Sequence, residues 1–239
     1  MSFNAEQNKY LKEIYEGWKN LETRNSLFGN LPSAYNTNCP PIPWMGDLNK
    51  SIVIVSLEPL LSNSFDFQIQ ETKEYQKWKD FYLTNQYFER LYANNRFPAP
   101  YWKRLACFIK GYCNKKNQDD WIEILKLNAI EFPFLQYHAC SHPSNFTPTQ
   151  KVEDDFEKRL KFLSLPKDQI IVIVYGVSKW RYIKRYLNVD GEKESSIYNG
   201  VKFYYSNSFK GVIVLPQNSR NKNYSNEELF NIGEYLRDI

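Results

Sequence analysis

The chain has 239 residues, 42% of them hydrophobic, which is enough to bury the core of a single domain. Its 31 Lys and Arg against 27 Asp and Glu leave a net charge of +4, which permits a nucleic-acid partner without demanding one. No apolar run approaches the roughly 20 residues of a membrane helix, and the polar start shows no signal peptide. We therefore expect a cytoplasmic protein that neither spans nor binds a membrane. The four cysteines form no C-x-x-C pair, so we expect free thiols.

Apolar residues recur at helical spacing in several segments. In the first of them, Tyr10, Leu11, Ile14 and Trp18 fall on one face. The last begins with Ser225, three residues before Glu228, which is the pattern of a capping box. Helices are predicted over 4–21, 70–91, 101–112, 149–163, 177–187 and 226–236.

Short β-branched runs bounded by Pro or Gly predict strands buried on both faces. Strands are predicted over 51–55, 121–130, 169–175 and 211–215, with a hairpin over 196–206 that turns at Asn199-Gly200. Because strands and helices alternate, we predict an α/β fold with a mostly parallel sheet. One domain is expected over residues 1–239, with the helix and loop of 1–45 packed on it.

Ligands of open α/β sheets bind beyond the carboxyl ends of the strands. This rule selects 56–63, 128–142, 175–179 and 216–223. In the first of these, Glu58 lies on a tight turn where a carboxylate could hold a water, although a lone Glu more often caps a helix or pairs with a lysine. The last is rich in polar donors, and its simpler interpretation is a solvated loop.

Three other groups of residues are interpreted as structural. His138, Cys140 and His142 lack the spacing of a zinc site, so no metal is expected. The segment 175–179 has a single glycine, which carries little phosphate specificity. Basic and aromatic residues alternate over 101–110, but an amphipathic helix is the commoner explanation.

Taken in order, three segments resemble motifs of the uracil-DNA glycosylase superfamily. The turn Ser56-Leu57-Glu58-Pro59-Leu60 resembles the water-activating motif, Leu127-Asn128 the middle motif, and Pro216-Gln217-Asn218-Ser219-Arg220 the late loop. The resemblance extends from about residue 44 to residue 224. It implies a three-layer α/β/α fold and hydrolysis of the N-glycosidic bond of a deaminated base.

The resemblance also implies roles for individual residues. Glu58 would align the attacking water, and Gln217 would stabilise the leaving base. The substrate would be bound by Asn128, which selects the base, by a stacking ring such as Phe134, Phe65 or Phe67, and by Asn218, Ser219, Arg220 and Lys222 in the late loop. The expected partner is DNA, single-stranded DNA included, bound by a monomer without a cofactor.

The chain departs from the family pattern at three points. Ser56 and Leu60 stand where the family has glycines, and Gln217 stands where it has His or Asn. The cysteine spacing does not match the cluster of the iron–sulfur branch. Two hypotheses therefore remain: a hydrolase that uses Glu58, or a non-catalytic module on the same fold that binds nucleic acid or a nucleotide.

Overall fold

The structure is a computed structural model of the chain. It describes residues 3–20, 35–36, 40–56, 72–84, 99–136, 138–139, 149–163, 167–173, 180, 183–194, 201–215 and 224–239. The chain forms two compact units. The first unit comprises Met1–Leu48, Ser56–Tyr87 and Glu131–Ser164, and the second comprises Asn49–Val55, Phe88–Ile130 and Leu165–Ile239. The single domain over residues 1–239 stays a prediction.

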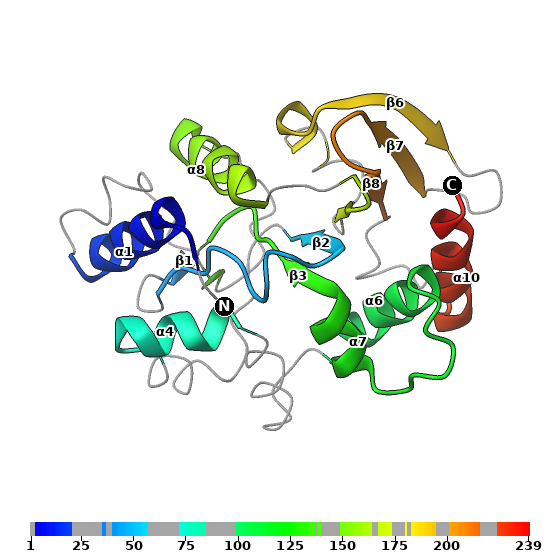
Figure 1. The fold of residues 1–239 in the computed structure, drawn as a ribbon, viewed down its shortest axis with the longest axis horizontal. Coiled ribbons are helices and arrows are strands. Elements are labelled where there is room, and N and C mark those ends of the chain that lie inside the picture. Colours follow the sequence, from blue (N-terminus) through cyan, green and yellow to red (C-terminus); the bar gives the residue numbers. More distant parts are fainter. Residues whose placement is uncertain are drawn as a thin grey trace. The chain divides into compact units, whose positions relative to one another are not determined.

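A six-stranded sheet, in the order β3-β2-β5-β8-β7-β6, forms the centre of the second unit (Figure 1). Its strands are β2 (Ile52–Val55), β3 (Ala129–Glu131), β5 (Ile170–Ile173), β6 (Val189–Glu194), β7 (Lys202–Ser206) and β8 (Gly211–Val214). The β2–β5 and β5–β8 pairs are parallel, whereas β8–β7 and β7–β6 are antiparallel. Thus β2, β5, β8 and β6 run one way and β7 runs the other. The α/β class expected from the sequence is confirmed.

The parallel strands form because their side chains are β-branched and buried on both faces. All four residues of β2 and of β8 are buried, as are Ile170 and Ile171 of β5. The predicted strands over 51–55, 169–175 and 211–215 are therefore confirmed in their central residues. The predicted hairpin is also present as β6 and β7, but its first strand lies earlier than expected, with Glu194 opposite Lys202.

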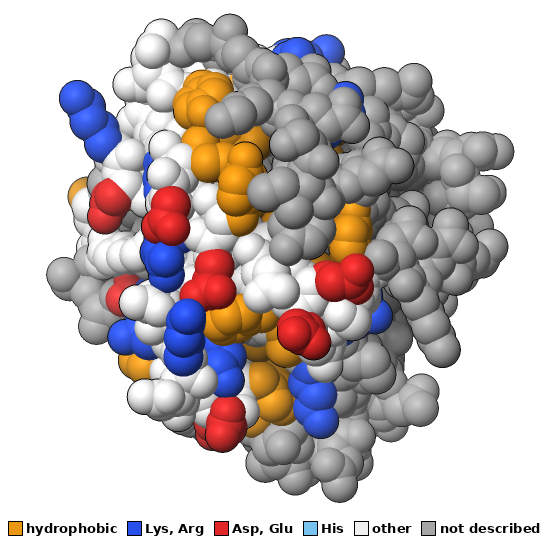
Figure 2. All heavy atoms as spheres, turned by 90° about the vertical axis from the view of Figure 1, so that its right-hand side faces the viewer, with side chains coloured by type: hydrophobic (Ala, Val, Ile, Leu, Met, Phe, Trp, Pro, Cys, Tyr) orange, Lys and Arg blue, Asp and Glu red, His pale blue; other side chains and the backbone are white. Residues whose placement is uncertain are grey.

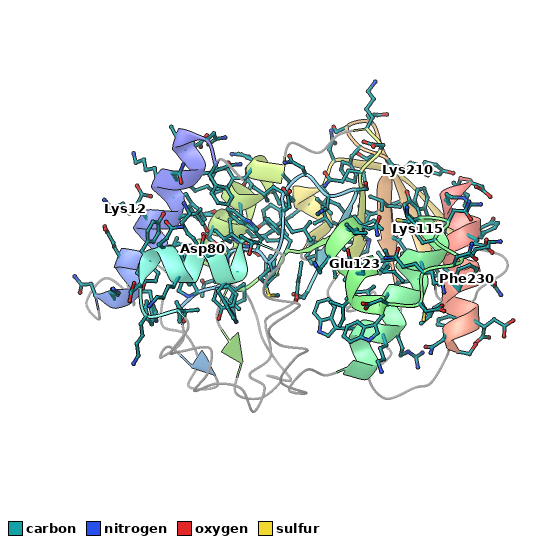
Figure 3. The ribbon with its side chains drawn as sticks, turned by 60° about the horizontal axis from the view of Figure 1, so that its bottom comes forward. Lys12, Asp80, Lys115, Glu123, Lys210 and Phe230 are labelled. Carbon is teal, nitrogen blue, oxygen red and sulfur yellow. The ribbon has the colours of Figure 1, made fainter. Side chains whose placement is uncertain are left out.

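Three helices of the second unit are described: α6 (Ala99–Tyr112), α7 (Trp121–Asn128) and α10 (Asn226–Arg237). The helices α6 and α10 lie side by side (Figures 1 and 3). Two glycines allow their backbones to approach closely: a Cβ added at Gly111 would lie 2.0 Å from the Phe230 oxygen, and one at Gly233 would lie 2.2 Å from the Phe108 oxygen. The predicted capping box of α10, Ser225 with Glu228, is confirmed.

The predicted strand over 121–130 is wrong for most of its length, because 121–128 is helical. Asp120 caps this helix, accepting hydrogen bonds from the backbone N of Ile122 (2.9 Å) and of Glu123 (3.4 Å). The polar residues Glu123 and Lys126 form an ion pair of 3.3 Å one turn apart. The N-cap and this pairing outweigh the β propensity of the isoleucines. The strand β3 begins only at Ala129.

The first unit packs three helices around an aromatic core. They are α1 (Ala5–Lys19), α4 (Tyr75–Tyr82) and α8 (Gln150–Leu160), and α8 continues as a 3-10 turn over Lys161–Leu163. Two short strands, β1 (Tyr35–Asn36) and β4 (His138–Ala139), pair antiparallel. The helices predicted over 4–21 and 149–163 are confirmed, and that over 70–91 is confirmed for Tyr75–Tyr82. Tyr15 illustrates the packing: it contacts Trp78 at 5.1 Å between ring centroids and donates to the Lys73 oxygen at 2.6 Å.

Two predicted features lie largely outside the described residues. The turn at Asn199-Gly200 is one, and most of the helix over 177–187 is the other, of which the 3-10 helix Lys184–Tyr186 is described. None of the helices that the structure describes is long and apolar enough to cross a membrane.

Acidic and basic side chains are interspersed on the described part of the face shown in Figure 2. Ion pairs of the second unit follow this pattern: Lys116 lies 2.7 Å from Glu234, and Lys110 lies 3.0 Å from Asp119. Alternating charges of this kind create only a weak net field for phosphate. The described part of this face therefore gives no support to a nucleic-acid contact there.

Candidate functional site

The carboxyl ends of the three central strands lie level in the sheet. In the register of the parallel pairs, Val55 of β2 lies opposite Ile173 of β5, and Ile173 lies opposite Val214 of β8. The two motifs singled out in the sequence follow directly after Val55 and after Leu215. Most of the predicted site residues lie outside the described residues, namely Glu58, Gln217, Asn218, Ser219, Arg220 and Lys222.

Asn128 is not where the sequence placed it. It is the last residue of α7 and precedes β3, so it lies at the amino end of that strand and not at its carboxyl end. Its side-chain amide donates to the Ile124 oxygen at 2.7 Å, within the same helix. The expectation that Asn128 lies near the carboxyl end of the predicted strand over 121–130 is wrong, because the segment before it is helical.

Phe134 follows β3, within one of the segments that the strand-end rule selected. Its ring is only 1% exposed and contacts Phe156 edge-on at 4.8 Å between centroids. Its backbone N donates to the Ser56 oxygen at 2.7 Å. Phe134 therefore belongs to the core of the first unit in this structure, and a ring so enclosed presents no open face on which a base could stack.

A buried carboxyl group that the sequence analysis did not single out lies at the end of β3. Glu131 is 4% exposed, and burial raises its pKa to about 8, so the group is mostly protonated at neutral pH. Its backbone is fixed by two hydrogen bonds with Met45, Met45 N to Glu131 O at 2.8 Å and Glu131 N to Met45 O at 3.0 Å. An acidic residue that ends an apolar run just before Phe132-Pro133 was the available sequence signal.

Ser56 is the second buried polar residue at these strand ends. It follows β2, is 3% exposed, and its hydroxyl lowers the pKa of Glu131 by less than burial raises it. The hydroxyl interacts with the carboxyl, and this interaction favours the ionised form of Glu131. In the described part of the chain, neither Ser56 Oγ nor Glu131 Oε2 has a hydrogen-bond partner. Buried polar atoms without partners are rare in proteins, so each calls for an explanation.

Arg159 of α8 fixes the segment that follows β3. It is fully buried, and its guanidinium donates to the backbone oxygens of Pro43 (2.8 Å), Pro133 (2.7 Å) and Phe134 (2.8 Å). Its Nε also donates to Asp155 at 2.8 Å. Since a guanidinium holds its donors in a rigid plane, these four bonds set the path of the backbone past Phe134.

Asp155 extends the same network to α1. It accepts hydrogen bonds from the Tyr10 hydroxyl at 2.8 Å and from the Gln136 amide at 2.5 Å. Burial, followed by the charge of Asp155, raises the pKa of Tyr10 well above its ordinary value, so this phenol stays protonated. The hydrogen bonds of Asp155 with Tyr10, Gln136 and Arg159 thus satisfy the polar groups of the network. The network also fixes the backbone that follows Glu131.

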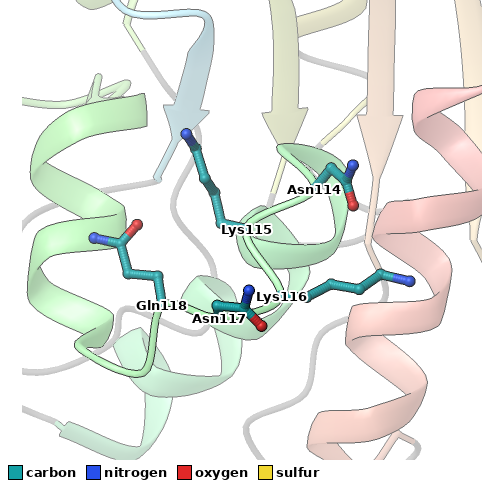
Figure 4. Close-up of a pocket in the computed structure, with 5 residues that line it drawn as sticks. All are labelled: Asn114, Lys115, Lys116, Asn117 and Gln118. Atoms are coloured by element: carbon teal, nitrogen blue, oxygen red, sulfur yellow. The ribbon is translucent and has the colours of Figure 1, made fainter.

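A polar hollow of about 610 Å³ lies on the turn between α6 and α7 (Figure 4). Three amides and two lysines line it: Asn114, Lys115, Lys116, Asn117 and Gln118. The turn follows from capping, because Asn114 adopts a left-handed φ of 53° and Lys115 N donates to the Lys110 oxygen at 2.9 Å. The hollow is open and is lined by one short stretch of chain. The turn that ends α6 is enough to account for it.

The described residues contain no cluster of three His, Cys, Asp or Glu side chains that could hold a metal. His138 lies in β4, whereas Cys140 and His142 fall outside the description. Cys107 and Cys113 are free thiols, as expected. Burial raises the pKa of both, to about 11 for Cys113, so neither is an activated nucleophile.

A comparison with models of known protein families finds no match, and a search of curated proteins finds none either.

Proposed function

We propose that the chain is a divergent member of the uracil-DNA glycosylase superfamily, which hydrolyses the N-glycosidic bond of a deaminated base in DNA. In this proposal its α/β fold is the three-layer α/β/α arrangement of that superfamily. The observation that carries the proposal is the register of β2, β5 and β8, whose last residues lie level in one parallel sheet.

Each of the two motifs follows one of the outer strands of these three, β2 or β8. Glu58 comes three residues after Val55, and Gln217 comes three residues after Val214. Neighbouring strands lie about 4.8 Å apart, so β2 and β8 are separated by about 10 Å. Both motifs therefore begin at the same edge of the sheet, the edge beyond which ligands of parallel sheets bind.

The proposed reaction starts with a base turned out of the stack, at a cost of a few kcal/mol. Glu58 accepts a proton from the water that attacks C1′, and its charge offsets the positive charge that develops on the sugar. The electron pair of the C1′–N bond moves to the base. Gln217 or Asn218 donates to a base oxygen as negative charge grows there, a stabilisation worth about 3 kcal/mol.

The test is alkali-induced strand cleavage of oligonucleotides that contain uracil, hypoxanthine or xanthine, both single- and double-stranded. The wild-type protein is expected to release at least one of these bases. Glu58→Gln should reduce the rate by at least about 100-fold, because a general base contributes about 10²–10⁴-fold. The matched control is Glu157→Gln, which removes an exposed carboxylate of α8 and should leave the rate unchanged.

Two results would contradict the proposal. One is the absence of release from every substrate by folded wild-type protein. The other is release that persists in Glu58→Gln. Tight binding of single-stranded DNA without release would favour the non-catalytic binding module in its place.

A further inference from the structure

The charge of the chain is divided unevenly between its two compact units. The second unit carries 20 of the 31 Lys and Arg but only 12 of the 27 Asp and Glu, a net charge of +8. The first unit carries the remaining 11 and 15, a net charge of −4. Because a polyanion is attracted by the summed field of a surface, the second unit is the part of the chain that suits one.

Within the second unit, basic residues are concentrated before and along α6. Residues 90–118 contain seven Lys and Arg and no Asp or Glu. At the end of α6 acidic neighbours offset this charge, because Lys110 pairs with Asp119 and Lys116 pairs with Glu234. The start of the helix differs. Lys103 is exposed and forms no ion pair with any residue that the structure describes.

The acidic side chains nearest to the start of α6 have interactions of their own. On α7, Asp120 accepts the hydrogen bonds of the N-cap, and Glu123 forms an ion pair within its own helix. On α10, a backbone hydrogen bond at the cap lowers the pKa of Glu228, and the charge of Arg104 lowers it further. The ammonium group of Lys103 therefore faces solvent without a neutralising carboxylate among the described residues.

An aromatic ring lies beside this cation. Lys103 Nζ is 6.0 Å from the centroid of the Trp121 ring, and Trp121 is half-buried at the first position of α7. The opposite side of α6 packs inward through Trp102, Leu105 and Ile109. Thus α6 is the amphipathic helix expected from the sequence, and the surface at its start presents a cation next to a ring.

This surface lies toward the carboxyl ends of the central strands. Lys210, the residue before β8, donates to the Arg237 oxygen at the end of α10, 2.7 Å away. The start of α10 therefore lies toward the carboxyl end of β8, because a helix of 12 residues is about 18 Å long. Arg104 of α6 donates to the oxygen of Tyr224, just before α10. This bond fixes the start of α6 near the end of β8.

We propose that Lys103 and Trp121 form a contact for a single strand of nucleic acid, with the ammonium group on a phosphate and the ring against the neighbouring base. The inference rests on the proposed function and deepens it, because it names the surface that holds the strand. A cation beside a ring suits a nucleotide, in which one sugar joins a charged phosphate to a flat base. Neither group reads the sequence, since every nucleotide offers both features.

The test measures the binding of a labelled oligothymidylate without damaged bases, by fluorescence anisotropy at several salt concentrations. Loss of one phosphate contact with a single strand reduces the salt slope by about 0.7, which corresponds to about fivefold weaker binding at about 0.1 M salt. We expect this result for Lys103→Gln. Trp121→Leu should weaken binding at least about fivefold with the salt slope unchanged, because stacking releases no counterion.

Two controls remove the same charge elsewhere. Lys9→Gln alters an exposed lysine of α1 in the first unit, and Lys167→Gln alters an exposed lysine before β5 in the second. Both should bind as the wild type does, and circular dichroism verifies that every variant is folded. Equal losses in Lys103→Gln and Lys167→Gln overturn the proposal, because the overall charge would then attract the strand. Wild-type affinity and salt slope in Lys103→Gln overturn it as well.

Two further arms identify the strand and separate the contact from the reaction. Binding of oligothymidylate or of the matching oligouridylate supports the contact if it depends on Lys103 and Trp121, and the tighter of the two identifies DNA or RNA. Such binding without base release from any damaged oligonucleotide overturns the glycosylase reaction alone. Base release with the wild-type KM in both Lys103→Gln and Trp121→Leu overturns the contact and leaves the reaction standing.

Discussion

Arg159 is the residue whose loss should damage the first unit most. In Arg159→Met, three backbone oxygens lose a buried donor, those of Pro43, Pro133 and Phe134, and Asp155 loses its ion pair. Each unsatisfied buried group costs about 1–3 kcal/mol, and removing one member of a buried pair typically costs about 3–5 kcal/mol. The methionine recovers part of this by packing on Phe132, whose ring Arg159 now covers.

We therefore expect Arg159→Met to lower the free energy of unfolding by about 3–5 kcal/mol. Urea titration followed by circular dichroism measures this as a shift in the midpoint at constant slope. The matched control is Lys161→Met, whose side chain is 72% exposed and whose replacement should change stability by less than about 0.5 kcal/mol. A loss below about 1 kcal/mol in Arg159→Met would refute the reasoning, since it would mean that the three oxygens find other donors.

Three further predictions concern the pH dependence, a helix crossing and a helix cap. The pKa of Glu131 is about 8 in the folded state, against an ordinary value of 4.5, so between these two pH values the unfolded state binds fewer protons than the folded state. The free energy of unfolding should therefore fall by up to about 5 kcal/mol from pH 4.5 to pH 8. Chemical denaturation of Glu131→Gln at the same pH values should show no such fall. Gly111→Ala should destabilise the protein by about 1–3 kcal/mol in thermal unfolding, because the 2.0 Å contact of the new Cβ with the Phe230 oxygen outweighs the gain in helix propensity. The control Asn231→Ala, on the exposed face of α10, should not destabilise it. Equal melting temperatures of the two variants would contradict this prediction. Asp120→Ala should cost about 1 kcal/mol through loss of the α7 N-cap, and unchanged stability in the same assay would mean that the cap contributes nothing.

The sequence predicted the parallel centre of the sheet well, because the continuous β-branched runs that mark the strands are also what stabilises them when they are buried. A run such as Ile52–Val55 can be buried on both faces only in the middle of a sheet, and Ser225 with Glu228 satisfies its own helix end without help from the rest of the chain. Short-range signals of this kind need no tertiary context.

The same reasoning failed over 121–130 because an apolar run of that length fits a buried strand and a short helix equally well. The cap at Asp120 and the packing of Ile122 and Leu125 decided for the helix, which moved Asn128 from the end of a strand to its beginning. A shift by one element was enough to remove a predicted site residue from the carboxyl end of the sheet.

The sequence by itself determined the α/β class and the three parallel strands of the sheet. Only the tertiary structure decided that Glu131 is buried beside Ser56, that Arg159 holds the chain next to it, and that Phe134 is enclosed in the core. The physical reason is that protonation and burial depend on neighbours distant in the sequence. In the sequence Glu131 is one of 27 acidic side chains, whereas in the fold it is a buried carboxyl group whose pKa burial raises to about 8.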